Sequence, residues 1–240
     1  MSAAQKAAVV IPFYKTKLTP FEEIALKQCF TVLSAHPIIA VKPLSLELPT
    51  QLAAFAFSKK ISFNDSYFKD IHGYNALMLS ADFYNTFTDF EYILIYQPDA
   101  FVFNDELTAW CNKGYDYIGA PWLTEREPGI FRKIKNQLYF SYNAKYKNGM
   151  PKIGRQMENR VGNGGFSLRK IETFARYAAT YKQTIESYLG KRHPWFNEDI
   201  FWSIELNRKK NQMRIPDYKT ALKFSFETNP ARCLSLNNGK

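Results

Sequence analysis

Short, fully apolar runs alternate with longer amphipathic segments along the first part of the chain. The run AAVVIPFY (7–14) is apolar at nearly every position, which is typical of a strand buried on both faces of a sheet. Segment 19–36 has helical spacing, with Thr19 as N-cap, Pro20 at the first helical position and two glutamates in the first turn. With a strand predicted at 37–43, the chain opens β-α-β, which favours a Rossmann-like sheet.

The rest of the pattern continues this alternation. Further strands are predicted at 91–96, 115–122 and within 161–170, and further helices at 73–87, 104–114, 171–189 and from 197 to 210. Segment 44–71 has no single period. Segment 123–160 is basic and rich in Asn and Gly, and we expect a long excursion from the core there. We therefore predict one α/β domain over residues 1–240, with a mixed central sheet flanked by helices.

Charge and cysteine content restrict the function classes. The 240 residues carry 32 Lys and Arg against 22 Asp and Glu, and the resulting net charge of +10 attracts polyanions. Three widely spaced cysteines without a CxxC pair argue against a disulfide framework or a zinc site and fit a reducing compartment. The apolar runs are too short for a signal peptide or a membrane span. We therefore expect a cytoplasmic protein that is peripheral to the inner membrane at most.

Three polar motifs could carry chemistry. Gln97-Pro98-Asp99 follows the predicted strand at 91–96, and open α/β sheets bind ligands at the carboxyl ends of their strands. Gly162-Asn163-Gly164-Gly165 permits positive φ and close approach of a ligand. Asn197-Glu198-Asp199 begins a predicted helix, where the dipole favours the ionised acid that a general base needs. Each motif also has an ordinary interpretation, as a turn, a Gly-rich loop or a helix cap. The dinucleotide fingerprint and the P-loop are both absent.

The order of these motifs resembles the GT-A glycosyltransferases. In that family a Rossmann-like half leads to a DxD motif at a strand end, then to a Gly-rich loop and an xED motif, and QPD, GNGG and NED stand in those places here. VVIPFY also looks like the family's first strand. More closely, YNALMLS, YILIYQPDAFVF, YDYIGAPW, GNGGFSLR, NEDIFW and FSFE resemble a bacterial GT-A-like domain of unknown function that is associated with capsule and lipopolysaccharide genes. This resemblance covers residues 60–227.

The resemblance implies a nucleotide-sugar-dependent, inverting glycosyltransferase that acts on a glycan or lipid-linked acceptor. It implies a donor half at 1–103 and an acceptor half at 104–240. The implied donor-binding residues are Pro12, Tyr14, Lys69, Asn75, Gln97 and Asp99. The implied acceptor-binding residues are Trp122, Asn163, Gly164, Gly165 and Trp195, and the implied catalytic residues are Asp199 as base and Glu198 as the holder of acceptor hydroxyls. For the two tryptophans, core packing is the more common role.

The metal and the function each leave alternatives open. Gln97 replaces the first acid of DxD, no histidine follows Asp199, and divalent cations prefer several oxygen ligands. Either Asp99 binds Mg²⁺ or Mn²⁺ together with water and the diphosphate, or basic side chains such as Lys69, Arg169 and those of 123–160 neutralise the diphosphate. A catalytically degenerate GT-A-like binding domain and a nucleic-acid-binding module are the other functions. No recognised nucleic-acid motif occurs, so we expect no nucleic-acid partner.

Overall fold

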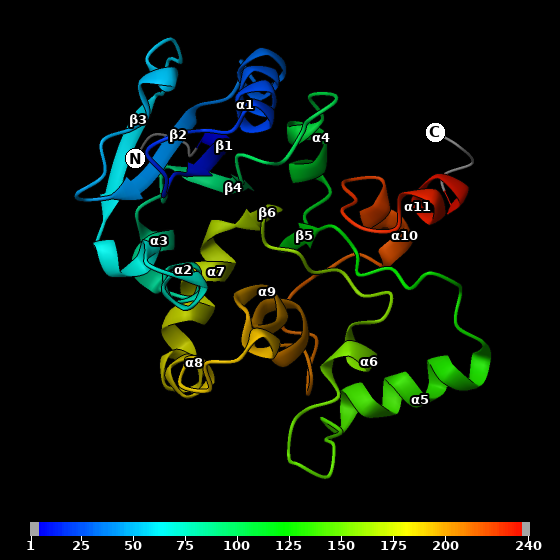
Figure 1. Cartoon of the computed structure of the whole chain (residues 1–240). Coiled ribbons are helices and arrows are strands. Elements are labelled where there is room, and N and C mark those ends of the chain that lie inside the picture. Colours follow the sequence, from blue (N-terminus) through cyan, green and yellow to red (C-terminus); the bar gives the residue numbers. More distant parts are fainter. Residues whose placement is uncertain (1–4, 237–240) are drawn as a thin grey trace. The chain divides into compact units, whose positions relative to one another are not determined.

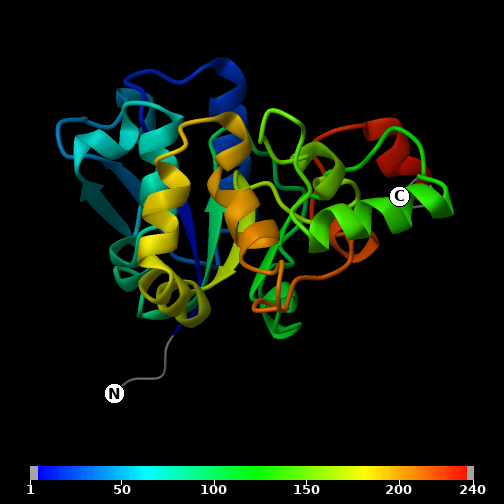
Figure 2. The ribbon, with the colours of Figure 1, turned by 90° about the horizontal axis from the view of Figure 1, so that it is seen from below.

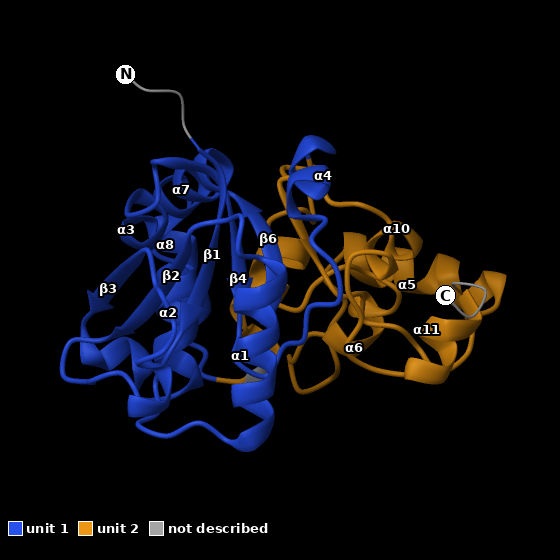
Figure 3. Cartoon of the chain, turned by 90° about the horizontal axis from the view of Figure 1, so that it is seen from above, with its two compact units in different colours: residues 1–114, 165–192 blue, residues 115–164, 193–240 orange. Residues whose placement is uncertain are grey.

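The computed structural model describes residues 5–236, which fold into two compact units (Figures 1 and 3). Unit 1 comprises residues 1–114 and 165–192, and unit 2 comprises residues 115–164 and 193–240. The predicted division at 103/104 differs from these units, because the chain returns to unit 1 at residue 165 after its first passage through unit 2.

Unit 1 contains a mixed sheet with the strand order β3-β2-β1-β4-β6. The strands are β1 (Gln5–Pro12), β2 (Ile38–Pro43), β3 (Lys59–Phe63), β4 (Phe90–Tyr96) and β6 (Phe166–Lys170). Strands β1 to β4 pair in parallel, and β6 is antiparallel to β4. Strands β1 and β4 are central, and their side chains are almost all buried, which explains their unbroken apolar runs.

Helices cover both faces of this sheet (Figure 2). The helices of unit 1 are α1 (Pro20–Val32), α2 (Ile71–Met78), α3 (Ala81–Asn85), α4 (Leu107–Asn112), α7 (Ile171–Thr180) and α8 (Lys182–Leu189). The blue α1 lies on one face, and the yellow α7 lies on the other, against β4. The predicted helix at 73–87 is two helices, because the Ser80 hydroxyl accepts a hydrogen bond from Phe83 N and caps α3.

The unassigned segment 44–71 contains β3 and two short 3₁₀ turns, η1 (Thr50–Leu52) and η2 (Asp65–Phe68). Its poor periodicity follows from this structure, since three short elements leave no room for a repeated pattern.

Arg169 of β6 belongs to the core of unit 1. Its side chain is fully buried, donates to Ser167 Oγ at 3.0 Å and to Tyr84 Oη at 2.8 Å, and lies over the ring of Phe174. A guanidinium held in this way stabilises the packing of β6 against α3 and α7. This burial removes Arg169 from the basic side chains that were expected to neutralise a diphosphate.

Unit 2 is mostly short helices around its own apolar cluster. Its elements are β5 (Tyr117–Gly119), α5 (Ile130–Ser141), α6 (Ile153–Met157), η3 (Pro194–Phe196), α9 (Glu198–Ile200), the π-helical η4 (Phe201–Glu205), α10 (Tyr218–Leu222) and α11 (Pro230–Leu236). The cluster consists of Phe140, Ile153, Ile200 and Ile204. The basic segment 123–160 contains α5 and α6, and it contributes Phe140 and Ile153 to this core.

None of the helices within residues 5–236 combines the length and apolar character that a membrane crossing requires.

Candidate functional site

The carboxyl ends of β1 and β4 form the part of unit 1 where the predicted donor residues gather. The two strands are parallel neighbours, with Val10 opposite Ile95, so both end at the same edge of the sheet. Pro12 ends β1, and Tyr14 follows with half of its surface exposed. The structure thus places Tyr14 and the QPD motif at one edge.

A tight turn presents Asp99 at this edge. Gln97 N donates to Gly165 O at 2.8 Å, and Ala100 N donates to Gln97 O at 2.9 Å, so Pro98 and Asp99 occupy the two central turn positions. Tyr96 Oη holds the far side of the turn through Ala100 O at 2.7 Å. Proline supplies the φ that the first central position needs. The Asp99 carboxylate is exposed and free to meet a ligand.

Lys15 is a functional candidate that the sequence analysis missed. Its Nζ donates to Glu22 Oε1 at 3.0 Å. This hydrogen bond raises the pKa of the Lys15 ammonium, and the charges of Tyr14, Glu22 and Asp99 act in the same direction. Lys15 comes three residues after Pro12, the last residue of β1, so it follows the strand end that lies beside the end of β4. The sequence signal that could have pointed to Lys15 is its position directly after the predicted strand at 7–14.

The other predicted donor residues lie on a different segment of unit 1. Lys69 is exposed at the end of η2, and Asn75 is buried within α2, whose N-cap is Asp70. Asn75 O accepts Leu79 N at 3.0 Å as part of the helix.

The residues at the end of β4 make a small ligand set for a metal. Within residues 5–236, no group of three or more His, Cys, Asp or Glu side chains could hold an ion. Asp99 offers a carboxylate and Gln97 an amide oxygen, which are hard ligands of the kind Mg²⁺ and Mn²⁺ use. This pair fits a divalent cation only if a diphosphate and water supply the remaining oxygens.

In unit 2, the Gly-rich segment is shaped by packing. A Cβ on Gly162 would overlap the Trp122 indole, and a Cβ on Gly119 of β5 would overlap the Gly162 carbonyl oxygen. The residue with positive φ in this segment is Asn163, at 56°, whereas Gly114 and Gly149 are the glycines with positive φ in the described chain.

Asn163 is held in place by a residue from the end of the chain. Its Nδ2 donates to a carboxylate oxygen of Glu227. Glu227 closes the FSFE motif, so two separate motifs of the sequence meet at this bond. Gly164 is buried beside it, and Gly165 belongs to unit 1, where its carbonyl accepts from Gln97.

The NED motif lies at the start of a helical segment with a π turn. Glu198 is buried and Asp199 is partly buried, and Asp199 Oδ1 accepts from Ile200 N at 2.7 Å. A hydrogen bond to a carboxylate favours its ionised form. Ser203 Oγ donates to the Asp199 carbonyl at 2.8 Å within the adjoining segment η4. π-helical turns occur frequently at functional sites.

The two predicted tryptophans pack against the apolar cluster of unit 2. Trp122 and Trp195 both contact this cluster, which includes Ile200, the residue after Asp199. Trp195 N also donates to the His193 ring at 3.2 Å, and the two rings stack. Unit 2 thus brings Trp122, Trp195 and the NED motif around one cluster, with Gly162 against the Trp122 indole.

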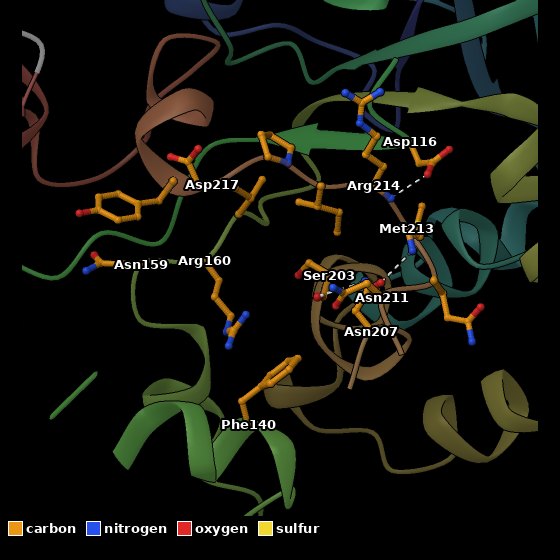
Figure 4. Close-up of a pocket in the computed structure, with 15 residues that line it drawn as sticks. Asp116, Phe140, Asn159, Arg160, Ser203, Asn207, Asn211, Met213, Arg214 and Asp217 are labelled. Carbon is orange, nitrogen blue, oxygen red and sulfur yellow. Dashed lines mark hydrogen bonds between the residues drawn. The ribbon is translucent and has the colours of Figure 1, made fainter. Parts of the chain in front are cut away.

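Unit 2 also contains a cavity of about 680 Å³ that both polar and apolar side chains line (Figure 4). Its wall includes Asn159, Arg160, Ser203 and Asn207, and Arg160 is one of the basic side chains of 123–160 that were candidates to neutralise a diphosphate. The Arg160 guanidinium lies 3.8 Å from the centre of the Phe140 ring. Its burial, and then the charge of Arg208, lower the pKa of Arg160. Such a wall can hydrogen-bond sugar hydroxyls or an anionic group.

Comparison with solved structures identifies the fold class. Core-mannan synthase A (CmsA/Ktr4) from Aspergillus fumigatus, in its Mn/GDP form, superposes with a TM-score of 0.57 at 12% identity, over 91% of this chain and 74% of that one. The chain therefore has the predicted GT-A-like α/β fold, with a mixed sheet flanked by helices. The mannosyltransferase Ktr4p from S. cerevisiae, in complex with GDP, matches with a TM-score of 0.46 at 9% identity, over 91% and 68% of the two chains.

Sequence comparison identifies the family. Residues 57–240 match the family described as "Protein of unknown function (DUF5672)", and the chain belongs to this family. No curated protein matches the chain.

Proposed function

We propose that this protein is a cytoplasmic glycosyltransferase that moves a sugar from a nucleotide-sugar donor to a glycan or lipid-linked acceptor in surface-polysaccharide synthesis. The observation that carries the proposal is the turn at the end of β4, which presents the exposed Asp99 at the sheet edge where β1 delivers Tyr14 and Lys15. The GT-A-like fold supports it, because ligands of such sheets bind at this edge.

On the donor side, each residue has a distinct task. The half-exposed Tyr14 ring stacks on the nucleotide base, which every base permits through its π-face. The Lys15 ammonium pairs with the diphosphate and stabilises the negative charge that develops on it. Lys69, Asn75 and Gln97 complete the donor contacts, and the core-mannan synthase structure with Mn and GDP supports a nucleoside diphosphate as leaving group.

A divalent cation would be held by Asp99 and the amide oxygen of Gln97. When bound, it would supply positive charge to the leaving diphosphate. Lys15, which follows the end of β1, would share that task.

On the acceptor side, Asp199 acts as general base. It takes the proton from the acceptor hydroxyl while the acceptor oxygen bonds to the anomeric carbon and the bond from that carbon to the diphosphate breaks. The sugar passes through an oxocarbenium-like transition state with inversion of configuration. The buried Glu198 positions the acceptor hydroxyls, while Asn163, held by Glu227, and the backbone at Gly164 and Gly165 line the acceptor side.

The test is transfer and hydrolysis with a panel of nucleotide sugars, each assayed with and without Mn²⁺ and Mg²⁺. We expect one donor class to be turned over, with release of its nucleoside diphosphate. Absence of both binding and turnover for every donor would overturn the proposal.

A second candidate is a GT-A-like domain that binds nucleotide without turnover. The observation that favours it is the sparse acidic set at the end of β4, where Gln97 stands in the first position of the motif. Tight binding of a nucleoside diphosphate without transfer to any acceptor or to water would select this candidate.

A further inference from the structure

Helix α5 presents an apolar stripe to solvent. Phe131 is 85% exposed, and Tyr142, directly after the helix, is 80% exposed. Ile130, Ile134 and Leu138 are each more than half exposed. With 3.6 residues per turn, these five positions fall on one side of the helix. A surface helix of a globular protein normally has the opposite arrangement, with polar residues outside.

The other side of α5 attaches the helix to unit 2. Phe140 is buried in the apolar cluster. Glu158 receives hydrogen bonds from both Arg132 and Asn136, at 2.9 and 2.6 Å. The stripe is therefore not a core face that has lost its neighbours, because the helix already has a packed face opposite to it.

Lysines occur on helix α5 and in the turn that follows it. Lys133 and Lys135 lie on the same helix, and Lys145 and Lys147 are exposed in the turn that follows it. Segment 123–160 contains nine Lys and Arg against three Glu, so it carries an excess of six of the chain's +10 charges. Lys133 is paired with Glu127 at 2.5 Å, while Lys135 lies 5.7 Å from the centre of the Tyr139 ring.

Large apolar side chains flanked by lysines match one kind of surface in particular. Helices in the plane of a bilayer interface bury an apolar face at the boundary between headgroups and acyl chains, and keep Lys and Arg at the level of anionic headgroups. Lys and Arg side chains near an anionic leaflet strengthen such binding by electrostatic attraction. A nucleic-acid backbone would use the charge of this segment but not the stripe of Ile, Phe and Leu.

We propose that α5 is an interfacial helix that docks this protein on an anionic lipid bilayer, with Ile130, Phe131, Ile134, Leu138 and Tyr142 inserted into it. The docking does not require the proposed enzymatic function. One consequence of the docking does rest on the proposed function: the acceptor would be carried by a lipid in the same membrane.

The test is flotation of the full chain with phosphatidylcholine vesicles and with vesicles of equimolar phosphatidylcholine and phosphatidylglycerol. We expect binding to the anionic vesicles, weakened by added salt, and little binding to the neutral ones. The double variant Phe131→Ser/Ile134→Ser should lose binding about tenfold or more, because two exposed side chains no longer enter the bilayer. The control is Phe21→Ser, since Phe21 on α1 is as exposed as Phe131, at 83%, but lies in unit 1.

Equal binding of the double variant and the wild type, or no binding of the wild type to anionic vesicles, would overturn the docking. Self-association in solution that disappears in the double variant, without vesicle binding, would assign the stripe to a second copy of the chain and would also overturn it. Because the readout is flotation without any donor, its outcome is independent of whether a nucleotide sugar is turned over.

Discussion

Trp122 lies directly over Gly162, in the space that any side chain at position 162 would occupy. The same indole contacts the apolar cluster of Phe140, Ile153, Ile200 and Ile204. The contact therefore links the backbone beside Asn163 to the packing beneath the NED motif, within one compact unit.

Gly162→Ala should displace the Trp122 ring and destabilise the protein by about 1–3 kcal/mol, because the added methyl group has no room to enter. Urea unfolding monitored by tryptophan fluorescence measures this change. The matched control is Gly190→Ala after α8, where the new Cβ would lie 3.5 Å from the nearest atom and φ is −57°. Equal stability of the two variants would contradict this account of Gly162.

Asp199→Asn should lower kcat by about 10²–10⁴-fold, since an amide cannot accept the acceptor's proton. Donor binding, measured by calorimetry, should remain close to the wild-type value, because the proton transfer belongs to the chemical step. Asp82→Asn is the control, as Asp82 also lies in the first turn of a helix but is in α3 of unit 1. Near-normal turnover in Asp199→Asn would exclude Asp199 as base.

Asp99→Asn should weaken nucleoside diphosphate binding about tenfold or more in the presence of Mn²⁺, while binding in EDTA stays at the wild-type level. This pattern is expected if Asp99 acts through a cation. Lys15→Gln should weaken binding in both conditions, because its ammonium contacts the diphosphate directly. The exposed neighbour Lys17 provides the control, Lys17→Gln. If Asp99→Asn weakens binding equally with Mn²⁺ and with EDTA, Asp99 does not act through a metal.

The capping box of α1 should give a pH-dependent contribution to stability. Thr19 Oγ1 accepts from Glu22 N, and Glu22 Oε2 accepts from Thr19 N at 2.7 Å. Burial raises the pKa of Glu22, but its hydrogen bonds from Thr19 and Lys15 outweigh this and hold the pKa below its ordinary 4.5. A lowered pKa in the folded state means that the ionised carboxylate stabilises the fold above pH 4.5, and that this stabilisation is lost as the pH falls through the folded-state pKa.

Glu22→Gln should therefore be less stable than the wild type near neutral pH, and the difference should shrink in acid. Thr19→Ala should cost about 1 kcal/mol through loss of the cap. Urea titrations at a series of pH values measure both effects, with Glu172→Gln as a control in the first turn of α7. A difference between Glu22→Gln and the wild type that does not change with pH would contradict the ionised capping box.

Some features of this protein were predictable because they depend on neighbours in the sequence. The cap of α1 follows from Thr19, Pro20 and Glu22 standing together, and the structure confirms it. Strand β4 follows from its apolar run, and Asp99 appears in a turn at its end because proline and aspartate are suited to that turn. Because these signals are local, Asp99 on the donor side could be proposed from the sequence alone.

Other features were missed because a general sequence rule did not apply to the segment concerned. Segment 123–160 was expected to be a long excursion from the core, and its helix was not predicted, although Ile130, Ile134 and Leu138 have helical spacing. Their apolar side faces solvent, so the usual assumption that an apolar face marks a core contact could not place the helix. Lys15 and Arg160 were missed as individual site residues because basic residues are common and only their surroundings distinguish them.

By itself, the sequence determined the α/β alternation, the parallel central strands and the polar motifs that follow or precede regular elements. These depend on periodicity and on turn and cap chemistry, which act over a few residues. Only the tertiary structure decided that Gly162 is small because of Trp122, that Asn163 is held by Glu227, and that Arg169 is buried against Tyr84. The physical reason is that these partners lie tens of residues apart in the chain and become neighbours only when each unit folds.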